Sequence, residues 1–406
     1  MSFQQKKIVL ISSGQPSLNP RLVKEADALT NAGYNVTVLY TYWNDWGTRH
    51  DQQLLPEKKW KAIRAGGDPV QKRTEWLLSR IIHKISGYML QKAGGYKYLA
   101  DIAIARGSYF LIKEAKKHEA DLYIAHNLGA LPATVKTAQV YRKPCGFDAE
   151  DFHRQEVSDD VNSYNFKISS YIEDKYLPLV NYISASSPLI AEQYALLYKR
   201  AVTCIINVFP KTPALSITRN EDKPLKLFWF SQTIGTNRGL ETAIEAMALT
   251  ETSIELHLLG QPANGYQQQL LQLAQTKGIN NGVFFYEPVQ ADELFNIAAQ
   301  FDIGLASETG FCLNNNMALS NKIFTYIQSG LAVAASNTPA QMALMDQYQQ
   351  TGKLYKNAVQ LANILSLYNA NRELLHQTKK AAFKTGQTKL NWEIESGKFL
   401  KMIENA

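Results

Sequence analysis

Short apolar runs alternate with amphipathic stretches along the whole chain. The runs that read as strands in the first half are 7–12, 35–42, 121–126, 144–149, 181–186 and 203–209. In the second half they are 225–233, 254–260, 283–289, 302–307, 331–336 and 352–355. Helix-like segments, such as 18–34 and 187–198, lie between them. This alternation predicts an α/β fold class, in which helices cover the faces of parallel sheets.

The length of the chain predicts two domains. A chain of 406 residues is too long for one ordinary core, and 45% hydrophobic with 19% charged residues is typical of a globular protein. The run 210–224 contains three prolines and mixed charges, so we expect a linker at 211–224. The linker would separate an N-terminal domain, 1–210, from a second domain, 225–385. The last residues, 386–406, read as a helix that packs back toward the first domain.

The positive charge of the chain is concentrated in its first half. Residues 1–210 carry 27 Lys and Arg against 20 Asp and Glu, whereas residues 211–406 carry 16 of each. Within the first half, residues 49–143 carry 18 basic and 8 acidic residues. Such an excess suggests an anionic partner, for example a membrane surface, a phosphorylated lipid or a nucleic acid. A solubilising surface would have the same composition.

The segment 74–92 does not follow the α/β alternation. Its apolar residues fall on one helical face, and the basic residues Arg80, Lys84 and Lys92 lie mostly elsewhere. These apolar residues are Leu77, Leu78, Ile81, Ile82, Ile85, Tyr88 and Met89. A basic amphipathic helix of this kind is typical of a membrane surface. A helix packed on the core of the domain would show the same pattern.

The cysteines and the N-terminal sequence indicate in which compartment of the cell the protein is expected. Cys145, Cys204 and Cys312 are far apart in the sequence and form neither a disulfide framework nor a metal-binding spacing. The apolar run near the N-terminus is too short for a signal peptide and reads as a first strand. No stretch reaches the roughly 18 apolar residues of a membrane span. We therefore expect a cytoplasmic protein, with association at the inner face of the membrane as a hypothesis.

Residues just after the predicted strands are the first candidates for a site, because doubly wound sheets bind ligands beyond the carboxyl ends of their strands. After 7–12, Gly14 allows a close backbone approach and precedes a helix N-terminus, which favours anions. At the end of 121–126, His126 is expected to face the cleft. A histidine that caps the next helix is the alternative interpretation.

The loop after 225–233 suggests an anion site. Gly235 relaxes the loop, Asn237 is expected to cap the following helix, and Arg238 would lie in its first turn. There the guanidinium and the helix dipole would act together on a diphosphate. A surface arginine is the alternative interpretation of Arg238.

A second group of polar residues follows the predicted strand 302–307. Glu308 comes directly after it, Ser320 is expected to cap a helix, and Lys322 falls in the first turns of that helix. An ionised glutamate only accepts hydrogen bonds, so Glu308 suits the hydroxyls of a ribose or a sugar. Arg238 and Lys322, each near a helix start, would stabilise the negative charge on a departing nucleotide diphosphate.

These segments carry a resemblance to a known family. The stretches SQTIGTNRG at 231–239 and SNKIFTY at 320–326 resemble the donor loops of GT-B-fold glycosyltransferases of the family-4-like, retaining kind. DLYIAHNLGALPA at 121–133 is similar to a segment of their acceptor domain. The resemblance covers most of the chain and is strongest over 225–345. It implies two Rossmann-like doubly wound domains that face a central cleft, which is the GT-B architecture.

The resemblance also implies roles for individual residues. His126 and Glu308 would be catalytic, because they would position the sugar. The donor would be bound by Gly14, Gln232, Asn237, Arg238, Gly239, Glu308, Asn321, Lys322 and Thr325. No metal and no cofactor is implied, since cationic side chains and helix N-termini would bind the diphosphate of the nucleotide-sugar. The acidic triplet at 148–150 superficially resembles the metal-binding triplet of another glycosyltransferase fold and is discounted for the same reason.

The implied function is that of a hexosyltransferase. It would move a sugar from a nucleotide-diphosphate sugar to a hydroxyl of a glycan or lipid-linked acceptor, with retention at the anomeric carbon, as in polysaccharide biosynthesis. Peripheral contact with an anionic membrane is a hypothesis that follows from the basic first half of the chain. A nucleic-acid partner is not expected.

The chain departs from the family where two glutamates seven residues apart are usual. Thr325 stands at the second glutamate position, Met317 lies eight residues before it, and Gln232 replaces a basic residue of the family. These departures leave a catalytically degenerate binding or scaffold protein as the alternative. A sugar-nucleotide epimerase would share the architecture, but no convincing acid/base pair can be placed. A Rossmann dehydrogenase is disfavoured because neither half opens with a glycine-rich dinucleotide loop.

Overall fold

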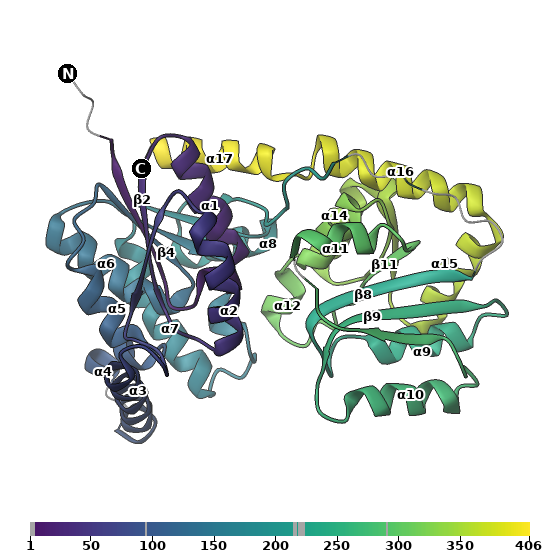
Figure 1. Ribbon diagram of the computed structural model, residues 1–406, viewed down its shortest axis with the longest axis horizontal. Helices are drawn as coiled ribbons and strands as arrows, with labels where there is room; N and C mark the ends of the chain where they lie inside the picture. The colour runs from purple at the N-terminus through teal and green to yellow at the C-terminus, as the bar shows by residue number, and fades with distance from the viewer. Residues whose placement is uncertain (1–4, 94–95, 214–216, 218–223, 290) are drawn as a thin grey trace. The chain divides into compact units, whose positions relative to one another are not determined.

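The computed structural model describes residues 5–93, 96–213, 217, 224–289 and 291–406, which form two compact units (Figure 1). The first unit comprises Met1–Ile206, Cys312–Asn314 and Ser396–Ala406. The second unit comprises Asn207–Phe311 and Asn315–Glu395. Of the predicted linker, 211–224, residues 214–216 and 218–223 lie outside the described part of the chain.

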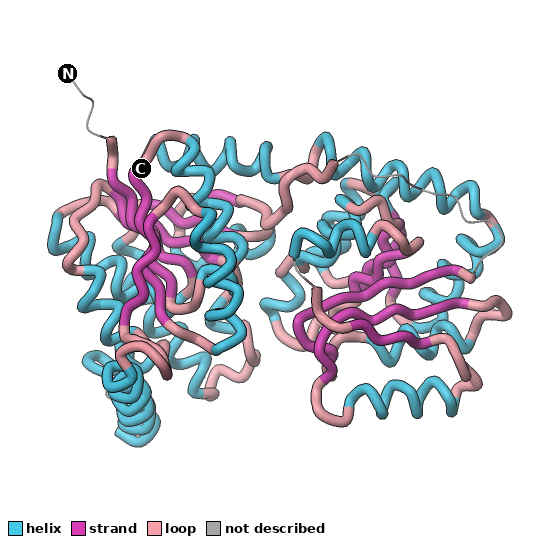
Figure 2. Tube along the Cα trace, viewed as in Figure 1, coloured by secondary structure: helices cyan, strands magenta, loops and turns pink. Residues whose placement is uncertain are grey.

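The first unit is built on a seven-stranded sheet whose faces are covered by helices (Figures 1 and 2). Its strands are β1 Lys7–Ser12, β2 Asn35–Thr41, β3 Lys61–Ala65, β4 Leu122–His126, β5 Cys145–Ala149, β6 Tyr182–Ala185 and β7 Thr203–Cys204. They are ordered β3-β2-β1-β4-β5-β6-β7, and every neighbouring pair is parallel.

The second unit is built on a six-stranded sheet. Its strands are β8 Leu225–Ile234, β9 Ile254–Pro262, β10 Val283–Tyr286, β11 Ile303–Ala306, β12 Ala332–Ser336 and β13 Gly352–Tyr355. They are ordered β10-β9-β8-β11-β12-β13, again with every neighbouring pair parallel.

Helices connect these strands. In the first unit they are α1 Pro20–Asn31, α2 Asp45–Leu54, α3 Arg73–Ala93, α4 Tyr96–Ala103, α5 Ser108–Ala115, α6 Leu131–Tyr141, α7 Tyr164–Tyr176 and α8 Pro188–Tyr198. The helices after β8 are α9 Leu240–Ala248, α10 Tyr266–Thr276, α11 Ala291–Ala298, α12 Leu313–Met317, α13 Asn321–Gln328, α14 Pro339–Gln347, α15 Ala358–Ala370, α16 Arg372–Thr388 and α17 Trp392–Glu404. Short 3-10 turns are Pro16–Leu18, Leu55–Glu57, Leu128–Ala130, His153–Gln155, Leu177–Leu179 and Gln349–Thr351.

The order of the strands reverses at one point in each sheet. In the first sheet the chain moves outward from β1 to β2 and β3, and then returns to place β4 on the other side of β1. In the second sheet it moves from β8 to β9 and β10, and then returns to place β11 beside β8. Connections that leave such neighbouring strands run to opposite faces of the sheet, which opens a crevice at their carboxyl ends. The ends of β1 and β4, and those of β8 and β11, are therefore the candidate ligand sites of the two sheets.

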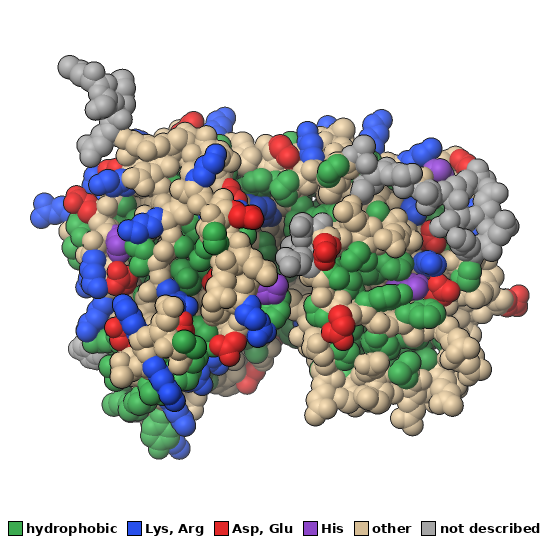
Figure 3. Space-filling model, viewed as in Figure 1, with side chains coloured by type: hydrophobic (Ala, Val, Ile, Leu, Met, Phe, Trp, Pro, Cys, Tyr) green, Lys and Arg blue, Asp and Glu red, His purple; other side chains and the backbone are tan. Residues whose placement is uncertain are grey.

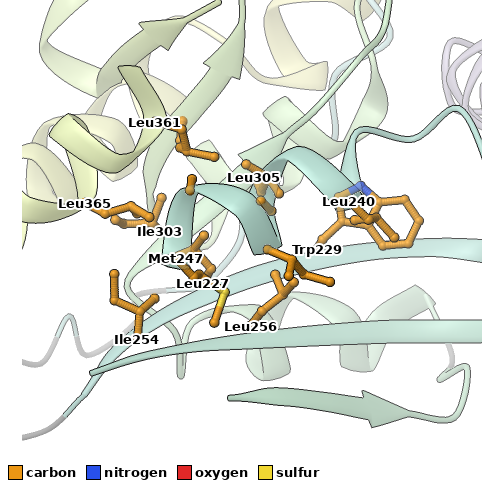
Figure 4. Packing of buried hydrophobic residues seen from close by; sticks show 14 of the residues in the cluster. Leu227, Trp229, Leu240, Met247, Ile254, Leu256, Ile303, Leu305, Leu361 and Leu365 are labelled. Carbon is orange, nitrogen blue, oxygen red and sulfur yellow. The ribbon is translucent and has the colours of Figure 1, made fainter. Parts of the chain in front are cut away.

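The central strand β8 is buried on both faces, as expected for a strand inside a parallel sheet. Leu227 and Trp229 point to one face, where they pack in a fully apolar cluster with α9 and α15 (Figure 4). Phe228 points to the other face and stacks on Phe301 with ring centroids 4.5 Å apart. This packing fixes the strand whose carboxyl end carries one of the candidate loops.

The predicted fold class, α/β with two doubly wound parallel sheets, is confirmed. The strand β3 was not predicted, because Lys61 and Arg64 interrupt its apolar pattern and it lies at the edge of the sheet. The predicted strand 203–209 is reduced to the two residues of β7.

The cluster beneath β8 gives a test of the packing. Leu227→Ala should lower the free energy of unfolding by about 3 kcal/mol, because Leu227 has no exposed surface and its truncation leaves a cavity. Leu249→Ala is the matched control, since Leu249 is 58% exposed, and it should change that free energy by less than about 0.5 kcal/mol. Urea unfolding followed by Trp fluorescence measures both. Equal effects of the two variants would contradict this description of the core.

Candidate active site at the strand ends

Two hydrogen bonds join the carboxyl ends of β8 and β11 in the second unit. The Ser307 hydroxyl donates to the carbonyl oxygen of Arg238 at 2.5 Å. The Thr309 hydroxyl donates to the carbonyl oxygen of Asn237 at 3.3 Å. Glu308 lies between these two donors in the sequence, so it is held beside the loop that carries Arg238. The structure thus brings together two of the predicted loops at the point where the strand order reverses.

The start of α9 differs from the prediction. The N-cap residue is Gly239, and the helix begins at Leu240, so Asn237 does not cap it and Arg238 precedes its first turn. The physical reason is the loop conformation: Asn237 has φ 59° and Gly239 has φ 70°, both in the left-handed region. A Cβ atom at Gly239 would lie 3.0 Å from Cβ of Ser307, tighter than an ordinary contact, and a φ of 70° is strained for a residue with a Cβ atom, so glycine favours this close approach to the end of β11.

A cavity of about 330 Å³ opens beside this loop. Its walls come from the end of β8 and from the connection between β9 and α10. Polar residues dominate the lining, including Thr233, Thr236, Asn264 and Gln269, and Arg238 is the one charged residue among the described lining residues. The cavity is within the size range of small-molecule sites. A polar cavity with a single guanidinium suits an anionic ligand rich in hydrogen-bonding groups.

Glu308 and Lys322 form a buried ion pair. The Lys322 ammonium lies 3.2 Å from Oε1 of Glu308, and the two side chains are 10% and 8% exposed. Asn315 donates a second hydrogen bond of 3.1 Å to the Glu308 carboxylate. Burial works to raise the pKa of Glu308, but the charge of Lys322 and the hydrogen bonds from Asn315 and Lys322 hold it below its ordinary value. The carboxylate is therefore ionised at neutral pH.

The position of Lys322 follows from the start of α13. Ser320 is the N-cap residue of this helix, as predicted, but its hydroxyl makes no capping bond to the helix backbone. Instead it lies 3.2 Å from the Lys322 ammonium, which donates to it. The same ammonium lies 5.5 Å from the ring centre of Trp229, close enough for a cation–π contact. Two side chains and one indole ring thus hold this cation in place.

The remaining predicted donor residues are placed differently. Thr325 is fully buried on α13, and its hydroxyl donates to the carbonyl oxygen of Asn321, one turn earlier. Asn321 is exposed and accepts a hydrogen bond from Asn207. Gln232 is an exposed residue within β8 and not in the loop after it. Of the predicted donor residues, Glu308 and Lys322 therefore contact each other directly, and the backbone of Arg238 is hydrogen-bonded to Ser307, the residue before Glu308.

The first unit has its own strand-end cluster at β1 and β4. Asn127, which has φ 61°, accepts a 2.6 Å hydrogen bond from the hydroxyl of Ser13 and donates to that of Ser12. A non-glycine residue in the left-handed region is a strained feature that occurs preferentially at functional sites. Beside it, the position where Gly14 would carry a Cβ atom is open, with no atom within 4 Å.

His126 does not face open space, contrary to the expectation. It is fully buried at the end of β4, with Nε2 3.2 Å from Glu25 and Nδ1 3.4 Å from Glu150. The reason is that the side chain points toward α1, which supplies Glu25 and the buried Arg21. Arg21 donates two hydrogen bonds, of 2.6 and 2.7 Å, to Asp148 on β5.

This buried network places the cations Arg21 and His126 among the carboxylates of Glu25, Asp148 and Glu150. Burial works to lower the pKa of His126, but the surrounding carboxylates, that of Glu25 first, raise it to about 10. Glu25, His126 and Asp148 have ligand atoms close enough together to hold a metal ion. However, the guanidinium of Arg21 lies against both carboxylates, 3.4 Å from Glu25 and 2.6 Å from Asp148, and its charge works against a cation there.

The sequence reasoning missed a small cavity of about 10 Å³ beside two tryptophans in the first unit, which has room for about one water molecule. Trp43 and Trp76 line it together with Arg80 and Arg106. Each guanidinium lies over an indole ring: Arg80 is 5.1 Å from Trp76, and Arg106 is 4.8 Å from Trp43. The signal in the sequence was the tryptophan directly after the strand 35–42, at the carboxyl end of β2.

Comparisons with known proteins support the architecture. No family model and no curated protein matches the chain. The structure of Anabaena HepE in complex with UDP has a TM-score of 0.70 and 16% identity, and covers 99% of this chain and 100% of HepE. The structure of a Rickettsia africae glycosyltransferase has a TM-score of 0.66 and 12% identity, and the match covers 99% of each chain. The structure of a mutant of S. aureus TarM, solved with fondaparinux, α-GlcNAc-glycerol and UDP, has a TM-score of 0.66 and 10% identity. The match covers 98% of this chain and 99% of TarM. The chain therefore has the fold of the GT-B glycosyltransferases.

The raised pKa of His126 gives a test with a defined pH dependence. The stabilisation from a histidine whose pKa is raised is complete below its unfolded value of about 6.5 and is lost as pH rises through about 10. His126→Gln should therefore lower the free energy of unfolding by about 3 kcal/mol at neutral pH, and the deficit should shrink toward about pH 10. Urea unfolding at several pH values measures it, with His50→Gln as the control. A deficit that does not vary with pH would contradict the charged state of His126.

Proposed function

We propose that the protein is a retaining glycosyltransferase that moves a hexose from a nucleotide-diphosphate sugar to a hydroxyl of a glycan or lipid-linked acceptor. The second unit would bind the donor, and the first unit would present the acceptor. The observation that carries the proposal is the junction of the β8 and β11 ends, where two hydrogen bonds place Glu308 and its partner Lys322 beside the loop of Arg238.

The charges at this junction suit a diphosphate. An ammonium group has three N–H donors, and that of Lys322 directs hydrogen bonds to Glu308 and Ser320 within the described chain. The third donor can reach a phosphate oxygen. Arg238 adds a guanidinium on the cavity wall, where a phosphate can be bound through two parallel hydrogen bonds. Together they would stabilise the charge that develops on the leaving nucleoside diphosphate.

The cavity beside Arg238 is the proposed place of the donor nucleotide. HepE, which has the same fold, has been solved with UDP and with UDP-glucose. The polar lining of the cavity offers hydroxyl and amide groups to the hydroxyls and base of a nucleotide. Glu308 would accept hydrogen bonds from sugar hydroxyls with its ionised carboxylate.

The acceptor side of the proposal rests on the first unit. The open position beside Gly14, at the end of β1, leaves room for an acceptor or donor group. His126 would act by holding β4 and its loop in position, since it has no exposed surface.

The chemistry needs no carboxylate nucleophile. A phosphate oxygen of the leaving group would take the proton of the acceptor hydroxyl on the same face of the sugar, which gives retention. The C–O bond to the diphosphate breaks as the new glycosidic bond forms. We place this reaction in the cytoplasm, where nucleotide-sugars would be the donors.

Alanine variants of the two cations test the proposal. Arg238→Ala and Lys322→Ala should each lower kcat/KM for sugar transfer or donor hydrolysis by about a hundredfold or more, because each removes charge stabilisation from the transition state. Lys277→Ala is the control, since Lys277 is exposed at the end of α10 and outside the cavity. Normal turnover in both site variants would rule out that Arg238 and Lys322 bind the diphosphate of the donor.

A binding or scaffold protein without catalytic activity is the second candidate. It is favoured by Thr325 and Met317, the non-acidic residues near the glutamate positions of the family, which are both buried. Calorimetric titration with UDP-, GDP- and ADP-sugars, combined with a hydrolysis assay, separates the two functions. An enzyme should bind one donor and turn it over with acceptor extracts. Saturable binding without any turnover would identify the scaffold.

A further inference from the structure

The helix α3 exposes a large apolar face. Six large apolar side chains on it are exposed: Leu77 44%, Leu78 47%, Ile81 52%, Ile85 54%, Tyr88 64% and Met89 46%. In the described chain, no other helix exposes more than two large apolar residues. Figure 3 shows hydrophobic and basic side chains gathered at the end of the first unit that α3 forms. The sequence left open whether these residues pack on the core, and the structure shows that they do not.

The opposite face of α3 is the one that packs on the first unit. The helix lies against α4 and α5, and the residues it buries are Ser79, Ser86 and Leu90. A surface helix of a globular protein ordinarily buries its large apolar residues and exposes its polar ones. In α3 two of the three buried residues are serines, and its other large apolar residues toward the unit, Trp76 and Ile82, are only half-buried, while six large apolar residues are exposed. The composition of α3 therefore serves something outside the unit and not the core.

The exposed apolar residues form one continuous surface. At about 100° per residue, the six side chains from Leu77 to Met89 fall within an arc of about 120°. The exposed cations Arg73, Arg80 and Lys84 lie along one edge of this arc, and Lys92 lies at its C-terminal end. Trp43, which is 45% exposed, lines the same cavity as Arg80 and extends the surface at the N-terminal half of the helix.

Charge decides which partner fits this surface. The segment 72–92 has five basic residues and a single acidic one, Glu75, which is half-buried. Long cationic side chains beside an apolar arc can reach lipid phosphates while the apolar residues enter the acyl boundary. Tyr88, the most exposed of the six, has the amphipathic ring that is enriched at membrane interfaces. A helix that lies in the interface needs no spanning length, and none of the described helices is long and apolar enough to cross a membrane.

We propose that α3 lays its exposed apolar face into the surface of an anionic phospholipid membrane, with Arg73, Arg80, Lys84 and Lys92 at the headgroup phosphates. The proposal stands on the surface of α3 alone and does not require that the second unit transfers sugars. It makes the protein a peripheral membrane protein that docks through its first unit.

Sedimentation of the full chain with vesicles tests the proposal. Vesicles of phosphatidylcholine and phosphatidylglycerol at about three to one are compared with phosphatidylcholine alone, at low and moderate salt. The protein should bind the mixed vesicles, and moderate salt should weaken binding, because it screens the attraction between the cations and the anionic surface. Absence of binding to mixed vesicles at low salt would overturn the proposal.

Variants of α3 separate its apolar and charged contributions. Ile81→Gln with Ile85→Gln should weaken binding at least about tenfold, because apolar burial is lost while glutamine keeps the helix. Lys84→Gln with Lys92→Gln should weaken binding to mixed vesicles by roughly thirtyfold and reduce its salt dependence. Leu196→Gln with Leu197→Gln, at exposed positions of α8, is the matched control and should bind as the unaltered protein does.

Two further measurements complete the test. Light scattering without vesicles should show the same molecular mass for the unaltered protein and the Ile81/Ile85 variant. A dimer that this variant abolishes would overturn the proposal and assign the surface to a second copy of the chain. Nucleotide-sugar titrations should be unchanged in all α3 variants, so a failure of the donor site and a failure of membrane docking give different results. Binding of the Ile81/Ile85 variant at the level of the unaltered protein would also overturn the proposal.

Discussion

Parallel strand pairing is the constraint on which the rest of the structure depends. Every neighbouring strand pair in both sheets is parallel, so all strands of a sheet end at the same edge. Because the order reverses between β1 and β4 and between β8 and β11, the connections at these points run to opposite faces of the sheet, which is where such folds place ligand sites. The ion pair of Glu308 with Lys322 lies at one of these points. The ion pair keeps the Lys322 ammonium in a buried position, where its charge would act strongly on the proposed diphosphate.

The sequence predicted the fold class and the loops, because both depend on local patterns. Apolar runs that alternate with amphipathic segments identify parallel sheets, and Gly239 or Glu308 can be placed after a strand by counting residues. The strand β3 was not predicted because its charged residues are tolerated only at the edge of a sheet. The position of a strand in the sheet depends on the tertiary structure and not on the local sequence. The start of α9 was not predicted because Asn237 and Gly239 have left-handed conformations, and Gly239 packs closely on Ser307, a contact that the local sequence does not reveal.

Contacts between distant side chains could not be predicted at all. His126 was expected at an open surface, but its surroundings are set by Arg21 and Glu25, about a hundred residues earlier in the chain. The pairing of Lys322 with Glu308 crosses a segment of 13 intervening residues, including α12, whose course the sequence does not reveal. For α3 the amphipathic pattern was visible, but only the structure shows that serines face the unit and large apolar residues face outward. A helical pattern defines two faces without telling which one is buried.

Hydrogen exchange with bound nucleotide tests the central claim most directly, namely that a diphosphate binds at the ends of β8 and β11. The backbone amides of 235–240 and 307–322 should exchange more slowly in the presence of whichever of UDP, GDP or ADP binds, because the ligand orders both loops. The sheet interior should show little change, since it is already protected. Unchanged exchange in 235–240 at a saturating nucleotide concentration, or protection confined to the first unit, would contradict the account.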